Sequence, residues 1–356
     1  MASILAIGDP HFKSDNGEST YELTAKVCEL IRSRLGSPGS LTAVVVLGDI
    51  LHRHEKIDLH PFHRAMTFLQ SIHDCIRETD AFLYVIIGNH DRSNNQVFMT
   101  DEHVFNPLKL WKNTIVVDRA TIHSPKEGVK FLLVPYVPPG RFREAYETVI
   151  SEVELNTGVQ AVFAHQEFKG ARMGAVASEE GDPWDTSKPL CVSGHIHDYQ
   201  EVSANMIYVG TPIQHGFADV GKKTVSVFDL SQTGYTQERI DLGIKGKITH
   251  RCNVEDFKLD DLDLEKYYVK VKATGTKRAI KTFRESKAFS EAERLGVVFQ
   301  FLELPTVEIE ERLSKVDSDV YQQIHSGKSF QERLQESLEK MDPMIRDEYR
   351  ELFKTF

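Results

Sequence analysis

Five short apolar runs of the sequence each end in polar residues of the types that bind divalent metal ions. In order, these ends carry Asp9 and His11, then Asp49 and His52, then Asn89, His90 and Asp91, then His165, and finally His195 and His197. In layered α/β proteins, ligands bind beyond the carboxyl ends of the strands. The order of the motifs therefore predicts five strand ends that deliver these side chains to one crevice.

The residue types favour a pair of divalent metal ions. Carboxylate, amide and imidazole groups together suit Mn²⁺, Fe²⁺ or Zn²⁺, and the absence of thiolates argues against a closed structural zinc site. Two cations about 3.5–4 Å apart need an anion between them, and Asp49 is the natural bridge. Residues two apart in an extended segment face the same way, so Asp9 with His11, and His195 with His197, are each expected to hold one site. The glycines that precede Asp9, Asp49, Asn89 and His195 are expected to let the chain turn sharply there.

Each part of this pattern has a simpler explanation when it is taken alone. A single Asp-x-His occurs by chance, a lone histidine in an apolar stretch is usually a core residue, and residues 89–91 are typical of a turn. The ordered set of five ends, each with its own kind of ligand, favours metal binding over these explanations.

The apolar runs themselves predict strands that are covered on both faces. They lie at residues 4–7, 43–47, 83–87, 130–134, 161–164 and 190–193. Helices are predicted between them at 21–34, 62–78 and 141–154, and a hairpin at 223–229 and 235–240. Strands that alternate with helices predict an α/β layered fold.

The rhythm changes near residues 243–247, which predicts a domain boundary. Residues 1–244 form the first predicted domain, and 245–305 a small α+β module with a strand at 267–274, a helix at 276–286 and a strand at 297–302. Residues 306–356 are charged and predicted to be helical. Phe330, Leu334, Leu338 and Met341 recur there at helical spacing, and this apolar stripe must be covered by another surface.

Composition narrows the class of protein. A chain of 356 residues fits two domains. Its net charge of −10 argues against a protein that coats nucleic acid non-specifically, although an enzyme with a local basic path stays possible. The four cysteines are scattered and form no CxxC pair, which is typical of buried thiols.

No run approaches the roughly 18 apolar residues that span a membrane, and the start lacks the features of a secretory signal. The protein is therefore expected in the cytoplasm, away from membranes.

The order of the motifs resembles that of the calcineurin-like metallophosphoesterases. This resemblance implies a β-sandwich flanked by helices, with a two-metal centre at its edge. It implies that the first metal is held by Asp9, His11, Asp49 and His197, and the second by Asp49, Asn89, His165 and His195. It also implies that His90 is not a ligand but faces the scissile phosphate as an acid or as a transition-state stabiliser.

The second and third motifs distinguish branches of this superfamily. Gly48 to His52 and Gly88 to Asp91 differ from the pattern of Ser/Thr protein phosphatases and are similar to that of SbcD-type DNA-repair nucleases. In that family the counterpart of His52 lies beside the active site and supports the catalytic histidine. Residues 209–212 follow His197 at the family's spacing. The resemblance implies a bacterial or phage enzyme with exonuclease and endonuclease activity, with Mn²⁺ as the expected metal and Mg²⁺, Fe²⁺ or Zn²⁺ as alternatives.

The predicted second domain is similar in layout to the family's DNA-capping domain and is locally basic. Lys270, Lys272, Lys277 and Arg278 are its candidate DNA-binding residues, with Lys270 and Lys272 on one strand face and Val269 and Val271 on the other. A solvated strand and helix surface explains the same charges.

The apolar stripe of residues 306–356 has two explanations. It packs either on the chain's own cap or, as the resemblance implies, on the coiled-coil base of an SMC-like ABC ATPase; a homodimer is a further family expectation. The resemblance implies a nuclease that acts on DNA in recombination, replication and break repair, and two other functions stay open. One is a phosphodiesterase of small molecules or cyclic nucleotides. The other is a scaffold without catalysis, against which the intact polar cluster argues.

Overall fold

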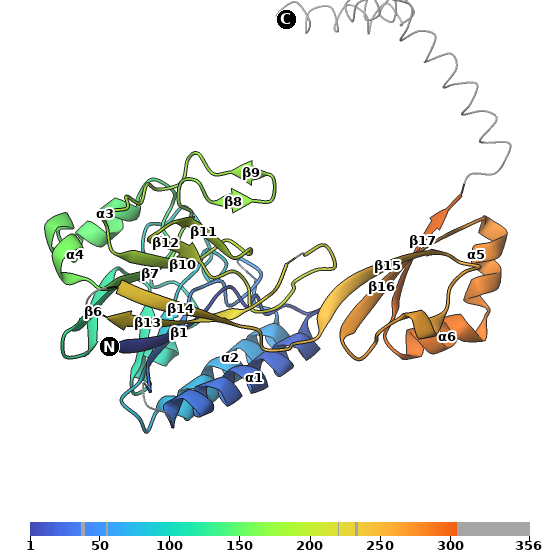
Figure 1. Ribbon diagram of the computed structural model, residues 1–356, viewed down its shortest axis with the longest axis horizontal. Helices are drawn as coiled ribbons and strands as arrows, with labels where there is room; N and C mark the ends of the chain where they lie inside the picture. The colour runs from blue at the N-terminus through green and yellow to red at the C-terminus, as the bar shows by residue number, and fades with distance from the viewer. Residues whose placement is uncertain (37–39, 55, 220, 232–233, 305–356) are drawn as a thin grey trace, which may run out of the picture. The chain divides into compact units, whose positions relative to one another are not determined.

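The computed structural model describes residues 1–36, 40–54, 56–219, 221–231 and 234–304 (Figure 1). They form two compact units. The first comprises Met1–Thr249 with Asp263–Val269, and the second comprises His250–Leu262 with the residues from Lys270 onward. The predicted domain bounds at 244/245 and 305/306 stay predictions. The predicted helical segment 306–356 and its apolar stripe lie outside the described residues.

Two six-stranded sheets form the body of the first unit. The first has the order β14 (Gly234–Ile240), β13 (Val225–Ser231), β1 (Ala2–Ile7), β2 (Leu41–Val46), β3 (Phe82–Ile86) and β4 (Thr114–Val117). The second has the order β11 (Gln200–Ser203), β12 (Met206–Tyr208), β10 (Leu190–Gly194), β7 (Ala161–His165), β6 (Val129–Val134) and β5 (Thr121–Lys126). Strands β1 to β4 run parallel to one another, as do β6, β7, β10 and β12.

Alternate residues of the central strands face different layers, and this explains why the strands are apolar throughout. In β2, Ala43 and Val45 belong to the core between the two sheets, whereas Val44 and Val46 pack towards the helices. Helices α1 (Gly17–Leu35) and α2 (Leu59–Ile76) lie side by side on the first sheet (Figure 1). The predicted strands covered on both faces are thus confirmed, and so are these two helices and the β13–β14 hairpin.

The second sheet is covered by two short helices where one was predicted. The sequence predicts a helix over residues 141–154, but α3 (Phe142–Glu147) ends early and α4 (Glu152–Gly158) begins after a break. Ser151 causes the new start, because its side chain accepts a hydrogen bond from the Glu154 amide while the Glu154 side chain accepts one from the Ser151 amide. This reciprocal cap satisfies two amides that a helix start leaves open. The prediction of one helix was wrong for that reason.

The second unit contains most of a three-stranded sheet and two helices. The sheet has the order β15 (Gly246–Asn253), β16 (Tyr267–Gly275) and β17 (Val298–Glu303). Between β16 and β17 lie α5 (Lys277–Arg284) and α6 (Lys287–Arg294), capped by Thr276 and Ser286. The helix predicted over 276–286 corresponds to α5, and α6 was not predicted.

Smaller elements complete the described chain. They are the ribbon of β8 (Arg172–Met173) and β9 (Val176–Ala177) and the 3₁₀ turns η1 (Asn106–Leu110) and η2 (Leu259–Asp261). Among the helices of the described residues, none combines the length and the apolar character that crossing a membrane requires.

The Ser151 cap gives a direct test of the break between α3 and α4. We expect Ser151→Ala to lower the free energy of unfolding by about 1 kcal/mol, because the start of α4 loses its acceptor. Urea unfolding followed by circular dichroism measures this change. Ser124→Ala, at an exposed strand position, is the matched control and should stay within about 0.5 kcal/mol of the parent. Equal stability of the two variants would show that the cap contributes nothing.

Candidate metal centre

The polar residues follow five strands that belong to both sheets of the first unit. Strands β1, β2 and β3 of the first sheet lead to Asp9, Asp49 and Asn89, whereas β7 and β10 of the second lead to His165 and His195. Within each sheet the neighbouring strands are parallel and end in register, with Ile7 beside Val46 and His165 beside Gly194. The predicted meeting of five strand ends is therefore confirmed, at an edge that two sheets share.

Hydrogen bonds between the two sheets fix this edge. His165 on β7 bonds through Nδ1 to the carbonyl oxygen of Leu47, at 2.7 Å. The amide of His195 donates to Oδ1 of Asp9, at 2.8 Å. Both contacts join residues that are far apart in the sequence, so the site forms only when the two sheets have packed.

One group of ligand-type atoms surrounds Asp49, His165 and His195. Nε2 of His165 lies 3.3 Å from Oδ1 of Asp49 and 3.0 Å from Oδ1 of Asn89. Nδ1 of His195 lies 3.1 Å from the same Asn89 oxygen. Four side chains from four strands thus direct nitrogen and oxygen atoms at one point.

A second group surrounds Asp9, His11 and Asp49, with His197 beside it. Nε2 of His11 lies 3.6 Å from Oδ2 of Asp49 and 3.0 Å from Nε2 of His197. Oδ2 of Asp9 is buried and has no hydrogen-bond partner in the described structure. Asp49 lies in both groups, which is the position expected of a bridging carboxylate.

The structure separates the two histidines of the last motif. His195 joins the group of Asn89 and His165, whereas His197 joins that of His11. The expectation from spacing alone, that both hold one site, was wrong because it assumed an extended backbone. His195 instead has a φ of 82°, in the left-handed region, so its side chain does not point the same way as that of His197. The division agrees with the one implied by the family resemblance.

Left-handed backbone is concentrated at the site itself. His11 and Asp49 also have positive φ values, of 41° and 47°. Such conformations cost energy in residues other than glycine and persist where the surroundings impose them. The expectation that the preceding glycines provide the sharp turns holds only for Gly48, with a φ of 100°. Gly88 serves a different need, because a Cβ there would lie 2.2 Å from Oδ1 of Asp49.

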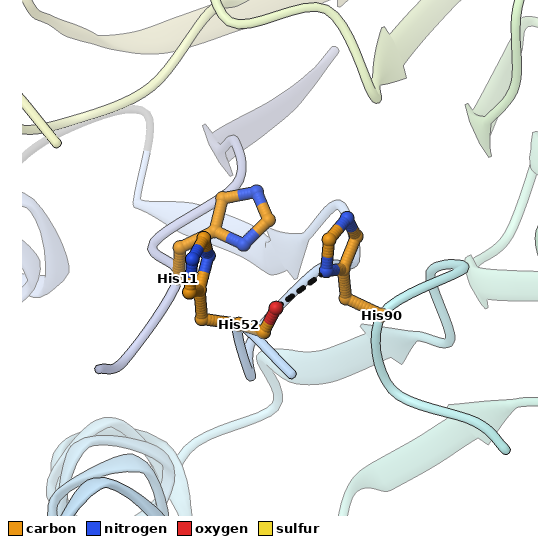
Figure 2. Close-up of side chains that lie close together, drawn as sticks. All are labelled: His11, His52 and His90. Atoms are coloured by element: carbon orange, nitrogen blue, oxygen red, sulfur yellow. Dashed lines mark hydrogen bonds between the residues drawn. The ribbon is translucent and has the colours of Figure 1, made fainter. Parts of the chain in front are cut away.

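His90 lies at the exposed side of the centre, beside His52 (Figure 2). Its Nδ1 is 2.6 Å from the backbone carbonyl of His52, and its amide donates to Oδ1 of Asp49 at 2.8 Å. Since a carbonyl oxygen only accepts, Nδ1 carries a proton, and Nε2 lies on the side of the centre, 3.9 Å from Oδ2 of Asp49. The His52 ring is stacked on that of His90 at 5.9 Å. The backbone of His52 therefore orients His90, which a motif cannot reveal.

Two further histidines of the site escaped the sequence reasoning. The ring of His54 lies 4.1 Å from that of His90. The ring of His215 lies 5.0 Å from that of His11 and 5.3 Å from that of His197. Nε2 of His215 bonds to the Asp9 carbonyl at 3.0 Å, and its buried Nδ1 has no partner among the described residues. In the sequence, the only indication that His215 belongs to the site is its position shortly after residues 209–212.

Asp91 connects the loops after β2 and β3 although it directs no atom at the centre. Its two carboxylate oxygens accept from the amides of Leu51, at 2.9 Å, and of Gly88, at 3.0 Å. Burial raises its pKa to about 6. The segment after β12 supports the last motif in a similar way, because the Thr211 amide donates to the His197 carbonyl at 3.1 Å.

Burial and charge divide the titratable groups into two kinds. Burial raises the pKa of Asp9 to about 7. Burial also opposes the charge on Asp49, yet His165 and His11 hold the pKa of that carboxyl well below its usual range. Burial likewise disfavours a charged His165, but Asp49 and Asp9 raise its pKa to about 9. By contrast, burial lowers the pKa of His195 to about 3 and that of His11 well below normal. In the metal-free chain, the positive charge of a protonated His165 thus offsets the negative charge of Asp49.

These residues fit two divalent metal ions. Oδ2 of Asp9 has no partner among the described residues, and Nε2 of His11 and Nε2 of His197 face each other at 3.0 Å; a cation would satisfy the oxygen and both nitrogens. Neutral imidazoles and carboxylates are the ligand forms that metals require. The His/Asp groups are consistent with a binuclear metal site.

The candidate DNA-binding residues lie in the second unit. On β16, Lys270 and Lys272 alternate with the buried Val269 and Val271, so the predicted division of the strand faces is confirmed. Lys277 and Arg278 are exposed on the first turn of α5. Cations are unfavourable at that end of a helix dipole, and the structure shows no acidic residue in that first turn.

Comparison with known proteins identifies the class. The family model for calcineurin-like phosphoesterases matches residues 2–199. The chain is 36% identical over 314 residues to Putative phosphoesterase 078R of Invertebrate iridescent virus 3, covering 87% of this chain and 86% of that protein. It is also 36% identical over 289 residues to Putative phosphoesterase 244L of Invertebrate iridescent virus 6, covering 80% of this chain and 98% of that protein.

The chain therefore belongs to the calcineurin-like phosphoesterase family, as its motifs predicted. It is a metal-dependent phosphoesterase. The relatives' names describe phosphoesterases and do not mention SbcD-type nucleases, so the narrower resemblance stays a prediction.

The space at Gly88 gives a first test of the centre. We expect Gly88→Ala to displace the Asp49 carboxylate, since the added methyl would overlap its Oδ1, and to weaken Mn²⁺ binding by at least about tenfold. Isothermal titration calorimetry measures this. Gly158→Ala is the matched control, because its added methyl would meet only the end of Lys130. Wild-type affinity in Gly88→Ala would contradict the close packing of the two loops.

The raised pKa of His165 gives a second test, of proton release. Below about pH 9 the metal-free His165 holds a proton that coordination must displace, whereas His11 and His195 are already neutral. We expect Mn²⁺ binding at about pH 7.5 to release close to one proton, and the release to vanish as the pH rises through about 9. Calorimetry in buffers with different ionisation enthalpies measures it. A release that is constant across this range would exclude His165 as its source.

Proposed function

We propose that this phosphoesterase is a DNA nuclease that hydrolyses phosphodiester bonds, as exonuclease and endonuclease, in DNA recombination, replication and double-strand-break repair. The observation that carries the proposal is the placement of His90, held by the His52 carbonyl beside a centre that Asp49 bridges. Gly48 to His52, the segment that supplies this carbonyl, is also the one that resembles SbcD-type nucleases.

In this proposal the two groups hold two divalent metals, with Mn²⁺ as the expected ion. Asp9, His11, Asp49 and His197 hold one, and Asp49, Asn89, His165 and His195 hold the other. When bound, such a pair neutralises the phosphodiester and supplies hydroxide near neutral pH. The backbone carbonyls of Leu47 and Leu51 orient His165 and His11 for this task.

His90 serves as the proton donor to the leaving oxygen. Its side chain is 26% exposed, so Nε2 is reachable from outside while Nδ1 is tied to the His52 carbonyl. An alkoxide leaving group needs a proton, and the His90 ring can give one from Nε2 when it is in the imidazolium form; Nδ1 keeps its own proton on the His52 carbonyl and the ring is left neutral. His52 is a positioning residue, because it acts on His90 through its backbone and its stacked ring.

Cations around His52 and His90 favour a polyanionic substrate. Arg53 and Lys56 line both the pocket beside His52 and the pocket beside His90. Lys13 also lines the first of these pockets, and Arg92 the second. Positive side chains beside His52 and His90 suit the phosphates of a nucleic-acid strand. A small diester would not need them.

The second unit and the ATPase partner extend the proposal. In this proposal Lys270, Lys272, Lys277 and Arg278 contact the phosphate backbone of DNA. Support comes from the exposure of Lys277 and Arg278 and from their unfavourable placement at the start of α5; Lys270 and Lys272 are half-buried. Docking on an SMC-like ABC ATPase and homodimer formation rest on the sequence alone.

Cleavage of end-labelled DNA tests the function. With Mn²⁺, we expect His90→Ala to lower kcat by about 10²- to 10⁴-fold on duplex and single-stranded DNA while two metals still bind. Asp49→Ala should abolish both cleavage and the paired metal binding. His52→Ala should cost less than His90→Ala, since the backbone carbonyl that holds His90 survives.

His60→Ala, at an exposed position on α2, is the matched control and should retain activity. Bis-p-nitrophenyl phosphate is assayed alongside. If the wild type hydrolyses this diester but leaves DNA intact, both alone and with a candidate ATPase and ATP, the enzyme is a small-molecule phosphodiesterase and the nuclease proposal fails.

A further inference from the structure

A lysine-lined pocket of the first unit lies beside the metal centre without being part of it. Its volume is about 480 Å³, within the range of ligand sites, roughly 300–1,000 Å³. Its walls come from the segments after β12 and β14, the start of β15 and the turn before β16. Five lysines line it against three acids. The lysines are Lys222, Lys223, Lys245, Lys247 and Lys266.

Two of these lysines reach the backbone of residues at the centre. Nζ of Lys223 lies 3.3 Å from the carbonyl oxygen of His197, and Nζ of Lys247 lies 3.2 Å from that of His215. The His215 ring in turn lies against those of His11 and His197. The pocket therefore adjoins the group of Asp9, His11 and His197, on the side that His215 covers.

Lys247 is a buried cation without an acidic partner. Its exposed fraction is 9%, and no carboxylate of the described residues lies within 4.0 Å of its Nζ. Lys222, Lys223 and Lys266 each have such a partner, at 3.4, 3.3 and 3.5 Å. A buried charge is costly unless it is paired.

A second ammonium group increases this imbalance. Nζ of Lys13 lies 2.8 Å from the same His215 carbonyl oxygen that Lys247 contacts. Burial, with the charge of Lys13, lowers the pKa of Lys247. Lys13 has its own partner, Asp15, at 3.2 Å, but that carboxylate is largely exposed and so is screened by water. Two ammonium groups on one oxygen call for an anion.

We propose that this pocket is a phosphate subsite, which binds a phosphate of the substrate strand that flanks the scissile one, with Lys247 as its buried cation. The inference rests on the proposed function and adds the path of the strand. Lysine acts as a compact point charge towards phosphate, and an anion here would balance Lys247 and Lys13 together. Lys13 also lines the pocket beside His52, so the cations continue from this subsite past the centre.

Chromogenic substrates that differ only in flanking charge test the subsite. Each set contains two tetrathymidylates with the same terminal p-nitrophenyl phosphate, which is at the 5′ end in the first set and at the 3′ end in the second. Within a set, the other linkages are phosphodiesters in one substrate and neutral methylphosphonates in the other. In at least one set we expect the wild type to prefer the charged strand in kcat/KM by about 10- to 100-fold. Lys247→Met should lose most of this preference and reduce the salt dependence by about one phosphate contact.

Three controls separate the subsite from other effects. Lys26→Met, on the exposed face of α1, should keep the preference. Lys247→Met should keep the wild-type rate on bis-p-nitrophenyl phosphate, and its Tm should stay equal or rise because a buried charge is removed. If Lys247→Met does not fold, Lys223→Met provides the same test, with a smaller effect since Asp198 already pairs with Lys223.

The outcomes distinguish the subsite from the proposed function. Hydrolysis of the simple diester by the wild type reports on the centre, and the charge preference reports on the pocket. A wild type that cleaves the diester but shows no preference in either set overturns the subsite alone. Equal losses on all substrates in Lys247→Met also overturn it, because they show an effect on the centre through His215.

If the diester is not cleaved, anisotropy of labelled tetrathymidylate tests the pocket without catalysis, and equal affinity of wild type and Lys247→Met overturns the subsite. If inorganic phosphate inhibits cleavage of the charged strand but not cleavage of the neutral strand, the pocket accepts free phosphate too.

Discussion

The centre depends on hydrogen bonds between histidine rings and backbone carbonyls of the strand ends. His165 bonds to Leu47, His11 to Leu51, His90 to His52 and His215 to Asp9. Because a carbonyl oxygen only accepts, each bond decides which ring nitrogen carries the proton and leaves the other free. Three of these acceptors lie just after β2, and one of the bonds joins the two sheets. The packing of the sandwich and the chemistry of the site are therefore set by the same contacts.

Burial makes the centre electrostatically incomplete without a cation. Asp9 and Asp49 are almost fully enclosed, and the described structure offers them one cation with a raised pKa, His165, while burial keeps His11 and His195 neutral. The left-handed conformations of His11, Asp49 and His195 add a cost in backbone energy. Hydrophobic packing of both sheets and their helices must offset these costs. Such a cluster satisfies no structural need, and this is the physical reason to interpret it as a metal centre.

The sequence predicted those features that depend on order along the chain. Apolar runs covered on both faces predict strands, and polar residues at their ends predict a cluster, since parallel strands end at a common edge. Features set by local backbone geometry escaped prediction. The direction of His195 follows from its φ, and the break before α4 follows from two reciprocal hydrogen bonds at Ser151. His54 and His215 reach the site from loops whose course only tertiary packing fixes. Pairing of the edge strands β5 and β11 was also beyond a sequence pattern, because all of their residues are half-buried or exposed and their apolar signal is weak.

The total charge does not argue against the proposed nucleic-acid substrate, because the charged residues are unevenly distributed over the molecule. A net charge of −10 repels polyanions from most of the surface. Around the centre, however, Lys13, Arg53, Lys56, Lys223 and Lys247 come from four separate stretches of the sequence. Low-dielectric walls strengthen their field at short range, while salt screens it beyond roughly 10 Å. In the proposed function, a strand would thus be attracted at the site, where its phosphates must be aligned for cleavage, and at the basic residues of the second unit, rather than over the whole surface. An acidic chain with a local basic path therefore favours release of the product over non-specific retention of nucleic acid.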